Sequence, residues 1–126
     1  MRKEIISTDR APRSKNSQAV KVGHLLYTGG QLGRNPKTGK YVGSDITSQA
    51  RQAIENLKVV LAAAGTSLEN VVKVTVFVRD LEDMPAFNEV YYEYFTANPP
   101  ARTGVQVAGL AAGALCEFDA VAVIPE

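Results

Sequence analysis

The chain of 126 residues is poor in the residue types on which disulfide and metal chemistry depend. It has one cysteine, Cys116, so no disulfide can form within the chain, and one histidine, His24. No cysteine and histidine spacing typical of a zinc site is present. These shortages exclude a small disulfide-stabilised scaffold, and we expect no metal site.

An excess of charge of one sign and long hydrophobic runs are also lacking. Fourteen Lys and Arg residues against thirteen Asp and Glu give a formal net charge of +1, and the cations in residues 2–21 are scattered. Nucleic-acid binding depends on clustered cations, so we expect no nucleic-acid partner. No apolar run approaches the roughly 20 residues of a membrane helix, and residues 1–7 do not resemble a signal peptide. We therefore predict a cytoplasmic protein without a membrane partner.

The length and the hydrophobic pattern predict a single domain over residues 1–126. Apolar residues alternate in several short segments and recur at helical spacing in two longer ones. The predicted strands are 20–22, 25–28, a hairpin element within 31–39, 72–78, 102–107 and 116–124, and the predicted helices are 46–64 and 83–95. The order β-β-β-α-β-α-β-β is typical of an α+β sandwich, in which two helices back one face of a mixed sheet.

Several local features support these elements. Asp45 is a plausible N-cap and Gly65 a plausible terminator of the first helix. Valines 72, 74, 76 and 78 alternate with other residues and predict a strand with one apolar face. Cys116 alternates with apolar residues and is expected to be a buried thiol, whereas His24 is expected in a solvated turn. The stripe of Phe87, Val90, Tyr91, Tyr94 and Phe95 is expected in the core.

Candidate chemistry lies in the sequence Pro100-Ala101-Arg102 and in Glu117, fifteen residues after the arginine. A guanidinium group presents a planar set of donors that fits a carboxylate with two parallel hydrogen bonds. A nearby glutamate can transfer protons or position a water molecule. In the alternative interpretation, Arg102 only begins a strand and pairs with a surface acid, while Glu117 pairs across the sheet with a basic residue.

Ordered segments along most of the chain favour the chemical interpretation. They are 17–23, Gly30-Gln31, 35–39, 49–57, 72–81, Pro100-Ala101-Arg102 and 117–123. From about Gln18 to the C-terminus the chain resembles the RidA/YjgF family of small imine deaminases. The resemblance implies a chorismate-mutase-like fold that assembles as a homotrimer, with the sheets forming a central barrel and each pocket lying between adjacent subunits.

The resemblance also implies roles for individual residues. Arg102 corresponds to the arginine that binds the substrate carboxylate, and Glu117 to the acidic residue beside the reacting imine. Asn88 corresponds to a pocket asparagine early in the second helix. Three further pocket positions differ from the family pattern, because Asn16, Gly29 and Gly104 stand where the family has tyrosine, serine and cysteine.

These residues predict a 2-imino or enamino acid deaminase that releases a 2-oxo acid and ammonia. Arg102 would hold the substrate carboxylate, Glu117 would position water or transfer protons, and neither a metal nor an organic cofactor would be required. The smaller residues at positions 16, 29 and 104 predict a preference for apolar substrates bulkier than three-carbon 2-aminoacrylate. Two alternatives stay open: a deaminase of a larger catabolic enamine, and a non-catalytic carboxylate-binding or chaperone-like trimer.

Overall fold

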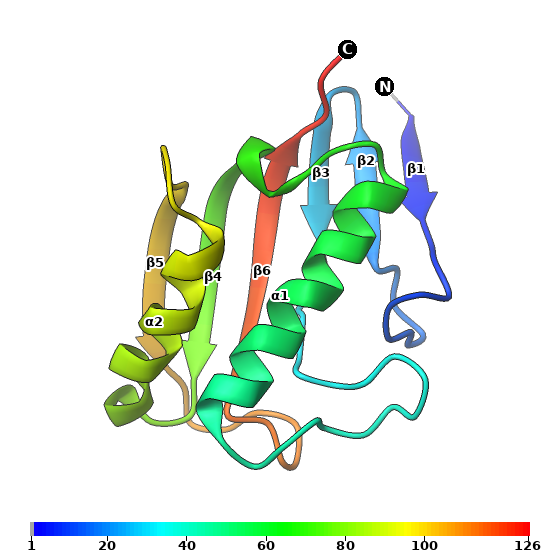
Figure 1. The fold of residues 1–126 in the computed structure, drawn as a ribbon. Helices are drawn as coiled ribbons and strands as arrows, with labels where there is room; N and C mark the ends of the chain where they lie inside the picture. Colours follow the sequence, from blue (N-terminus) through cyan, green and yellow to red (C-terminus); the bar gives the residue numbers. More distant parts are fainter. Residues whose placement is uncertain (1) are drawn as a thin grey trace.

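A computed structural model describes residues 2–126 as a six-stranded mixed sheet with two helices packed on one face (Figure 1). The elements are β1 (Lys3–Ile6), β2 (Ala19–Val22), β3 (Leu25–Thr28), α1 (Ile46–Ala63), η1 (Leu68–Asn70), β4 (Val71–Val78), η2 (Leu81–Asp83), α2 (Met84–Tyr94), β5 (Ala101–Gln106) and β6 (Cys116–Val123). The strand order is β1-β2-β3-β6-β4-β5, and only β4 and β5 among these neighbours run parallel. The predicted α+β architecture and order of elements are confirmed.

The last of the three strands predicted before the first helix is absent, and a strand that the sequence pattern did not predict precedes the other two. Residues 31–39 form no strand of the sheet and contribute only isolated bridges, Gln31 to Phe118 and Arg34 to Tyr41. The side chain of Asn35 instead accepts hydrogen bonds from the backbone of Lys37 and Thr38 in a local turn. The missing strand is β1, an exposed edge strand whose few apolar residues gave too short an alternation to detect.

Both ends of α1 follow the local signals. Asp45 accepts a hydrogen bond from the backbone N–H of Ser48 at 2.9 Å, as an N-cap does. Gly65 has a φ of +84°, a left-handed conformation that glycine adopts without steric cost, just after the helix. The buried face of the helix carries Ala50, Ala53, Ile54, Leu57, Val60 and Leu61. The Asp45 cap and the Gly65 terminator are confirmed.

Strand β4 departs from simple alternation near its start. Val74, Val76 and Val78 are fully buried, but Val72 is 45% exposed. The register with β6 shifts between Val71 and Lys73, so Val71 takes the buried position in place of Val72. The prediction that Val72 belongs to the apolar face was wrong because a bulge inserts one residue and changes the side that it faces.

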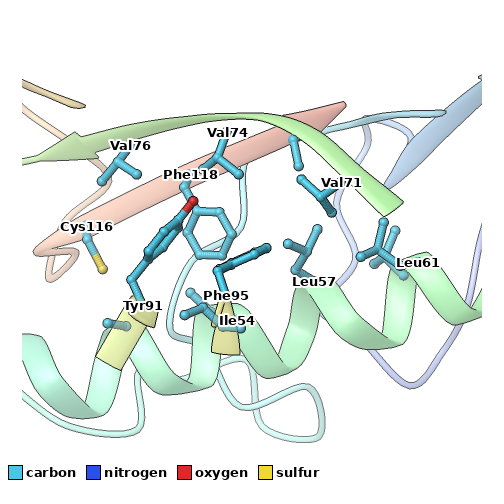
Figure 2. Packing of buried hydrophobic residues seen from close by; sticks show 14 of the residues in the cluster. Ile54, Leu57, Leu61, Val71, Val74, Val76, Tyr91, Phe95, Cys116 and Phe118 are labelled. Carbon is cyan, nitrogen blue, oxygen red and sulfur yellow. The ribbon is translucent and has the colours of Figure 1, made fainter. Parts of the chain in front are cut away.

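The core lies between the sheet and the helices. Side chains of α1 and α2 meet those of β4 and β6, with Tyr91 and Phe95 stacked at a ring-centroid distance of 4.5 Å (Figure 2). Cys116 is buried there as predicted, and burial, with smaller effects from the charges of Asp83 and Glu117, raises the pKa of its thiol to about 12. No helix of the described residues is long and apolar enough to cross a membrane.

Within residues 2–126, no helix lies over the opposite face of the sheet (Figure 1). Strand pairing places Leu25 opposite Val123 and Tyr27 opposite Val121, on the side away from the buried Leu26 and Ala122. Leu25, Tyr27 and Val123 are 38%, 47% and 36% exposed. The single chain therefore leaves an apolar sheet face in contact with solvent.

Candidate functional site

Arg102 lies on β5 and faces α2. It is paired with Val74 of β4, and because Val74 faces the helices, so does Arg102. Its Nη2 atom donates a hydrogen bond to Oδ1 of Asn88 at 2.5 Å and lies 3.2 Å from the sulfur of Met84. Its Nη1 atom is removed from solvent and has no hydrogen-bond partner within residues 2–126. Arg102 also forms no salt bridge within residues 2–126, so its positive charge is not neutralised by a carboxylate there.

Aromatic rings of α2 hold the guanidinium group in place. The Arg102 Cζ atom lies 4.5 Å from the ring centroid of Tyr91, 5.5 Å from that of Phe87 and 5.9 Å from that of Tyr92. Each ring lies within the range of a cation–π interaction. Burial raises the pKa of the Tyr91 hydroxyl to about 12, although the nearby positive charge of Arg102 opposes the shift. Tyr91 is therefore neutral, and its ring fixes the cation by stacking.

Glu117 lies in a separate cavity of about 410 Å³ at the other side of the sheet. The cavity is formed by the segment before β2, by the chain after β3 and by β6, and its lining includes Arg13, Asn16, Gly29, Gly30, Arg34 and Glu117. The bridge between Gln31 and Phe118 holds the chain after β3 against β6, with backbone hydrogen bonds of 2.7 and 3.1 Å. This arrangement places Gly30 beside the carboxylate of Glu117.

The Glu117 carboxylate lies directly against the backbone of Gly30. A methyl group added at Gly30 would overlap the Oε2 atom of Glu117, so the absence of a side chain there makes room for the carboxylate. Burial raises the pKa of Glu117, and the negative charge of Asp119 raises it further. A carboxyl group with a raised pKa keeps its proton closer to neutral pH, which suits proton transfer.

Arg102 and Glu117 do not meet within one chain. Phe77 of β4 pairs with Glu117, and because its neighbours Val76 and Val78 point to the helices, Phe77 and Glu117 face the opposite side. The six residues selected from the sequence therefore form two groups. Arg102 and Gly104 of β5 lie beside Asn88 and Met84 of α2, whereas Glu117, Asn16 and Gly29 lie at the cavity on the other face.

The sequence pattern missed several contacts of both groups. Met84, Tyr91 and Tyr92 surround Arg102, and the spacing of Asn88 and Tyr92 by one helical turn was a signal that could have indicated this. At Gly104 the space that a side chain would take is partly filled, because a Cβ atom there would lie 3.1 Å from the methyl carbon of Met84. Gly104 thus leaves less open room than its small size indicated.

Among residues 2–126, no three His, Cys, Asp or Glu side chains gather in a way that could hold a metal ion. The candidate chemistry is carried by an arginine, a carboxyl group and their polar neighbours.

Comparison with known proteins identifies the relatives of this chain. Residues 7–124 match the family model described as Endoribonuclease L-PSP. A RutC family protein of Pyrococcus horikoshii is 47% identical over 95% of this chain and 97% of its own length. The human 2-iminobutanoate/2-iminopropanoate deaminase is 42% identical over 96% of this chain and 90% of its own length.

A solved structure shares the fold as well. The crystal structure of RidA from an Antarctic Psychrobacter bacterium superposes with a TM-score of 0.92 and 41% identity, covering 96% of this chain and 99% of that one. Identity at this level over nearly complete chains goes beyond a shared fold. The chain therefore belongs to the RidA/YjgF family, whose model bears the name Endoribonuclease L-PSP.

Proposed function

We propose that this protein hydrolyses 2-imino and enamino acids to 2-oxo acids and ammonia. The observation that carries the proposal is the arrangement at Arg102, where Asn88 and the rings of α2 fix a guanidinium group that forms no salt bridge within residues 2–126. A substrate carboxylate would supply the missing negative charge. The name of the human relative, an iminobutanoate and iminopropanoate deaminase, agrees with a small substrate of this class.

Glu117 carries the proton transfers in this mechanism. Its carboxylate accepts a proton from a water molecule as the water oxygen bonds to the imine carbon, and the C=N double bond becomes a single bond. Glu117 passes this proton to the imine nitrogen, which gives a carbinolamine with an NH2 group. The hydroxyl proton then moves to the nitrogen through Glu117, the C–N bond breaks, and ammonia leaves as the C=O bond forms. Since free imines hydrolyse in water, positioning and electrostatics supply the required lowering of the barrier.

We propose further that the site forms between two copies of the chain in a homotrimer. Arg102 and Glu117 face opposite sides of the sheet, so each can reach a common substrate only when the Arg102 group of one copy lies beside the Glu117 cavity of the next. Association that buries the exposed apolar residues Leu25, Tyr27 and Val123 would be favoured by the hydrophobic effect. A ring of three such contacts would contain three equal sites.

A coupled assay tests the activity. An amino-acid oxidase generates the imine in the presence of semicarbazide, which traps it, and the protein should reduce the amount of trapped product. Arg102→Ala and Glu117→Gln should lose this effect, whereas Arg51→Ala, which removes an exposed ion pair with Glu93, should keep it. Unchanged trapping with the folded wild-type protein would contradict the proposal and would favour a protein that binds carboxylates without turnover.

Incubation with RNA is a useful control because of the family model's name. Cleavage of a phosphodiester by general acid–base catalysis needs a base and an acid, and the Glu117 cavity contains one carboxyl group beside two arginines. We expect that the protein does not cleave RNA through Glu117. Any cleavage that is seen should therefore be the same in the wild-type protein and in Glu117→Gln.

A further inference from the structure

Arg34 lines the Glu117 cavity and takes no part in the mechanism above. Its Nη2 atom donates to the hydroxyl of Tyr41 at 3.2 Å, and its Cζ atom lies 5.1 Å from the Tyr41 ring centroid. Its Nε atom is buried and has no hydrogen-bond partner within residues 2–126. Arg34 is therefore a partly buried cation with an unused donor at the edge of the reaction cavity.

The position of Arg34 is fixed by the core. Asn56 of α1 is buried, and its Nδ2 atom donates to the carbonyl oxygens of Leu32 and Arg34 at 3.0 and 2.9 Å. Tyr41, which supports the guanidinium group, pairs with Arg34 in an isolated bridge. These contacts hold the backbone and the side chain in one place, unlike the mobile arginine of an exposed surface.

No carboxylate of the described residues neutralises this cation. Arg34 forms no ion pair within residues 2–126, and the exposed Arg13, which lines the same cavity, donates only to the hydroxyl of Ser7. Glu117 is the acidic residue of the lining. Two arginines against one carboxylate leave the cavity with an excess of positive charge even when Glu117 is ionised.

The cavity is large enough for a ligand that reaches from Glu117 to Arg34. At about 410 Å³ it falls within the usual range of roughly 300 to 1,000 Å³ for small-molecule pockets, well beyond the need of a three-carbon imino acid. In the proposed trimer, a substrate whose first carboxylate is bound by Arg102 of a neighbouring copy can therefore extend a side chain along the Glu117 cavity.

We infer that Arg34 binds a second acidic group, so that the preferred substrates are 2-imino acids with a carboxylate on the side chain. This inference rests on the proposed function. Arg34 can donate from its terminal nitrogens to that carboxylate, and Arg13 adds positive charge at the cavity rim. The inference differs from the preference for bulky apolar imines that the small residues at positions 16, 29 and 104 indicated, and one substrate series distinguishes the two.

The kinetic test compares imines of glutamate, leucine and 2-aminobutanoate in the wild-type protein and in Arg34→Met, which keeps side-chain length without charge. We expect Arg34→Met to lower kcat/KM for the glutamate imine by about tenfold or more, the usual effect of losing a charge-assisted hydrogen bond, and to leave the other two nearly unchanged. Arg34→Lys should restore part of the loss. Arg51→Met is the matched control, since it removes an arginine outside the cavity.

Equal losses for all three imines, or a wild-type preference for the leucine imine, would overturn the inference while leaving the deaminase function standing. A binding measurement covers the case in which no imine is hydrolysed. By calorimetry, 2-oxoglutarate should bind the wild-type protein more tightly than 2-oxobutanoate does, and Arg34→Met should remove the difference. Equal binding of both oxo acids to the wild-type protein would overturn the inference independently of turnover.

Discussion

The orientation of the Arg102 guanidinium group depends both on its position in β5 and on its contacts with α2. The strand directs the side chain toward α2, where Asn88 accepts one hydrogen bond and the ring centroid of Tyr91 lies 4.5 Å from the guanidinium carbon. The planar group fits this place because it can lie over a ring and donate hydrogen bonds in its plane at the same time. Lysine has a compact charge and lacks the planar fork of donors that binds a carboxylate with two parallel hydrogen bonds.

We predict that Arg102→Lys lowers kcat/KM for imine hydrolysis by about 10- to 100-fold, because a charge-assisted hydrogen bond of about 1.5 to 3 kcal/mol is lost. The loss should appear mainly in KM if the contact forms equally in the ground state and the transition state. Thermal unfolding should confirm that the variant is folded. Wild-type kinetics in the lysine variant would show that two-pronged carboxylate binding is not used.

The raised pKa of Glu117 makes the stability of the fold depend on pH. Because the folded state binds this proton more tightly than the unfolded state does, the free energy of unfolding falls as the pH rises through the interval between the two pKa values. The ionised side chain therefore costs stability at neutral pH. If the Glu117 carboxylate is the base, activity should fall on the acidic side of the pH profile with an apparent pKa above the usual value of a glutamate.

We predict that Glu117→Gln unfolds at a higher temperature than the wild-type protein at pH 7 and that this difference shrinks as the pH is lowered. Asp119→Asn is a control, because burial raises the pKa of Asp119 too and its removal should likewise stabilise the protein. Only Glu117→Gln should abolish hydrolysis. A lower unfolding temperature for Glu117→Gln at pH 7 would mean that the ionised carboxylate is stabilised by a partner.

At the scale of elements, the chain after β3 decides where the Glu117 carboxylate lies. The bridge between Gln31 and Phe118 brings Gly30 beside Glu117, and the glycine leaves space for the side chain. Gly29, the preceding residue, differs in its surroundings, because a Cβ atom there would meet only backbone oxygens at 3.4 Å and beyond. Two adjacent glycines thus have unequal importance.

We predict that Gly30→Ala reduces activity by about tenfold or more while keeping the fold, since the added methyl displaces the flexible end of Glu117 rather than backbone. Gly29→Ala is the matched control and should remain close to wild type. Rates and unfolding temperatures of both variants provide the measurement. Similar activity of the two alanine variants would show that the carboxylate is not needed in its present position.

At the scale of the whole molecule, the sheet separates the two halves of the site. The helices cover one face, which holds Arg102, and leave the other face, which carries Glu117, Tyr27 and Val123, without a helix (Figure 1). Self-association through the apolar residues would cover them and bring the halves of different copies together. Assembly and activity are then inseparable.

We predict that light scattering gives about three times the 13.5 kDa chain mass, and that mixing two inactive variants restores activity. In trimers containing Arg102→Ala and Glu117→Gln chains at equal ratio, about one quarter of the contacts would combine both native residues. Co-expression should therefore recover about a quarter of the wild-type rate. Activity that stays absent in verified mixed trimers would show that the site does not form between chains.

The sequence by itself determined the elements with strong local signals. The Asp45 cap, the Gly65 terminator, the helical stripe of α1 and the burial of Cys116 all depend on residues close together in the chain. The pattern failed where the cause was not local. Val72 is excluded from the core because of the register of β4 against β6. Residues 3–6 form strand β1 because they pair with β2 in the sheet.

The same division applies to the candidate site. Motifs selected Arg102, Glu117, Asn88, Asn16, Gly29 and Gly104 from the sequence, and their roles remain predictions for experiment. The tertiary structure alone decided that Arg102 and Glu117 face opposite sides of the sheet, and that Arg34 enters the cavity of Glu117. The physical reason is that the direction of a strand residue follows from alternation and pairing with distant strands, whereas a motif specifies only chemical type and spacing.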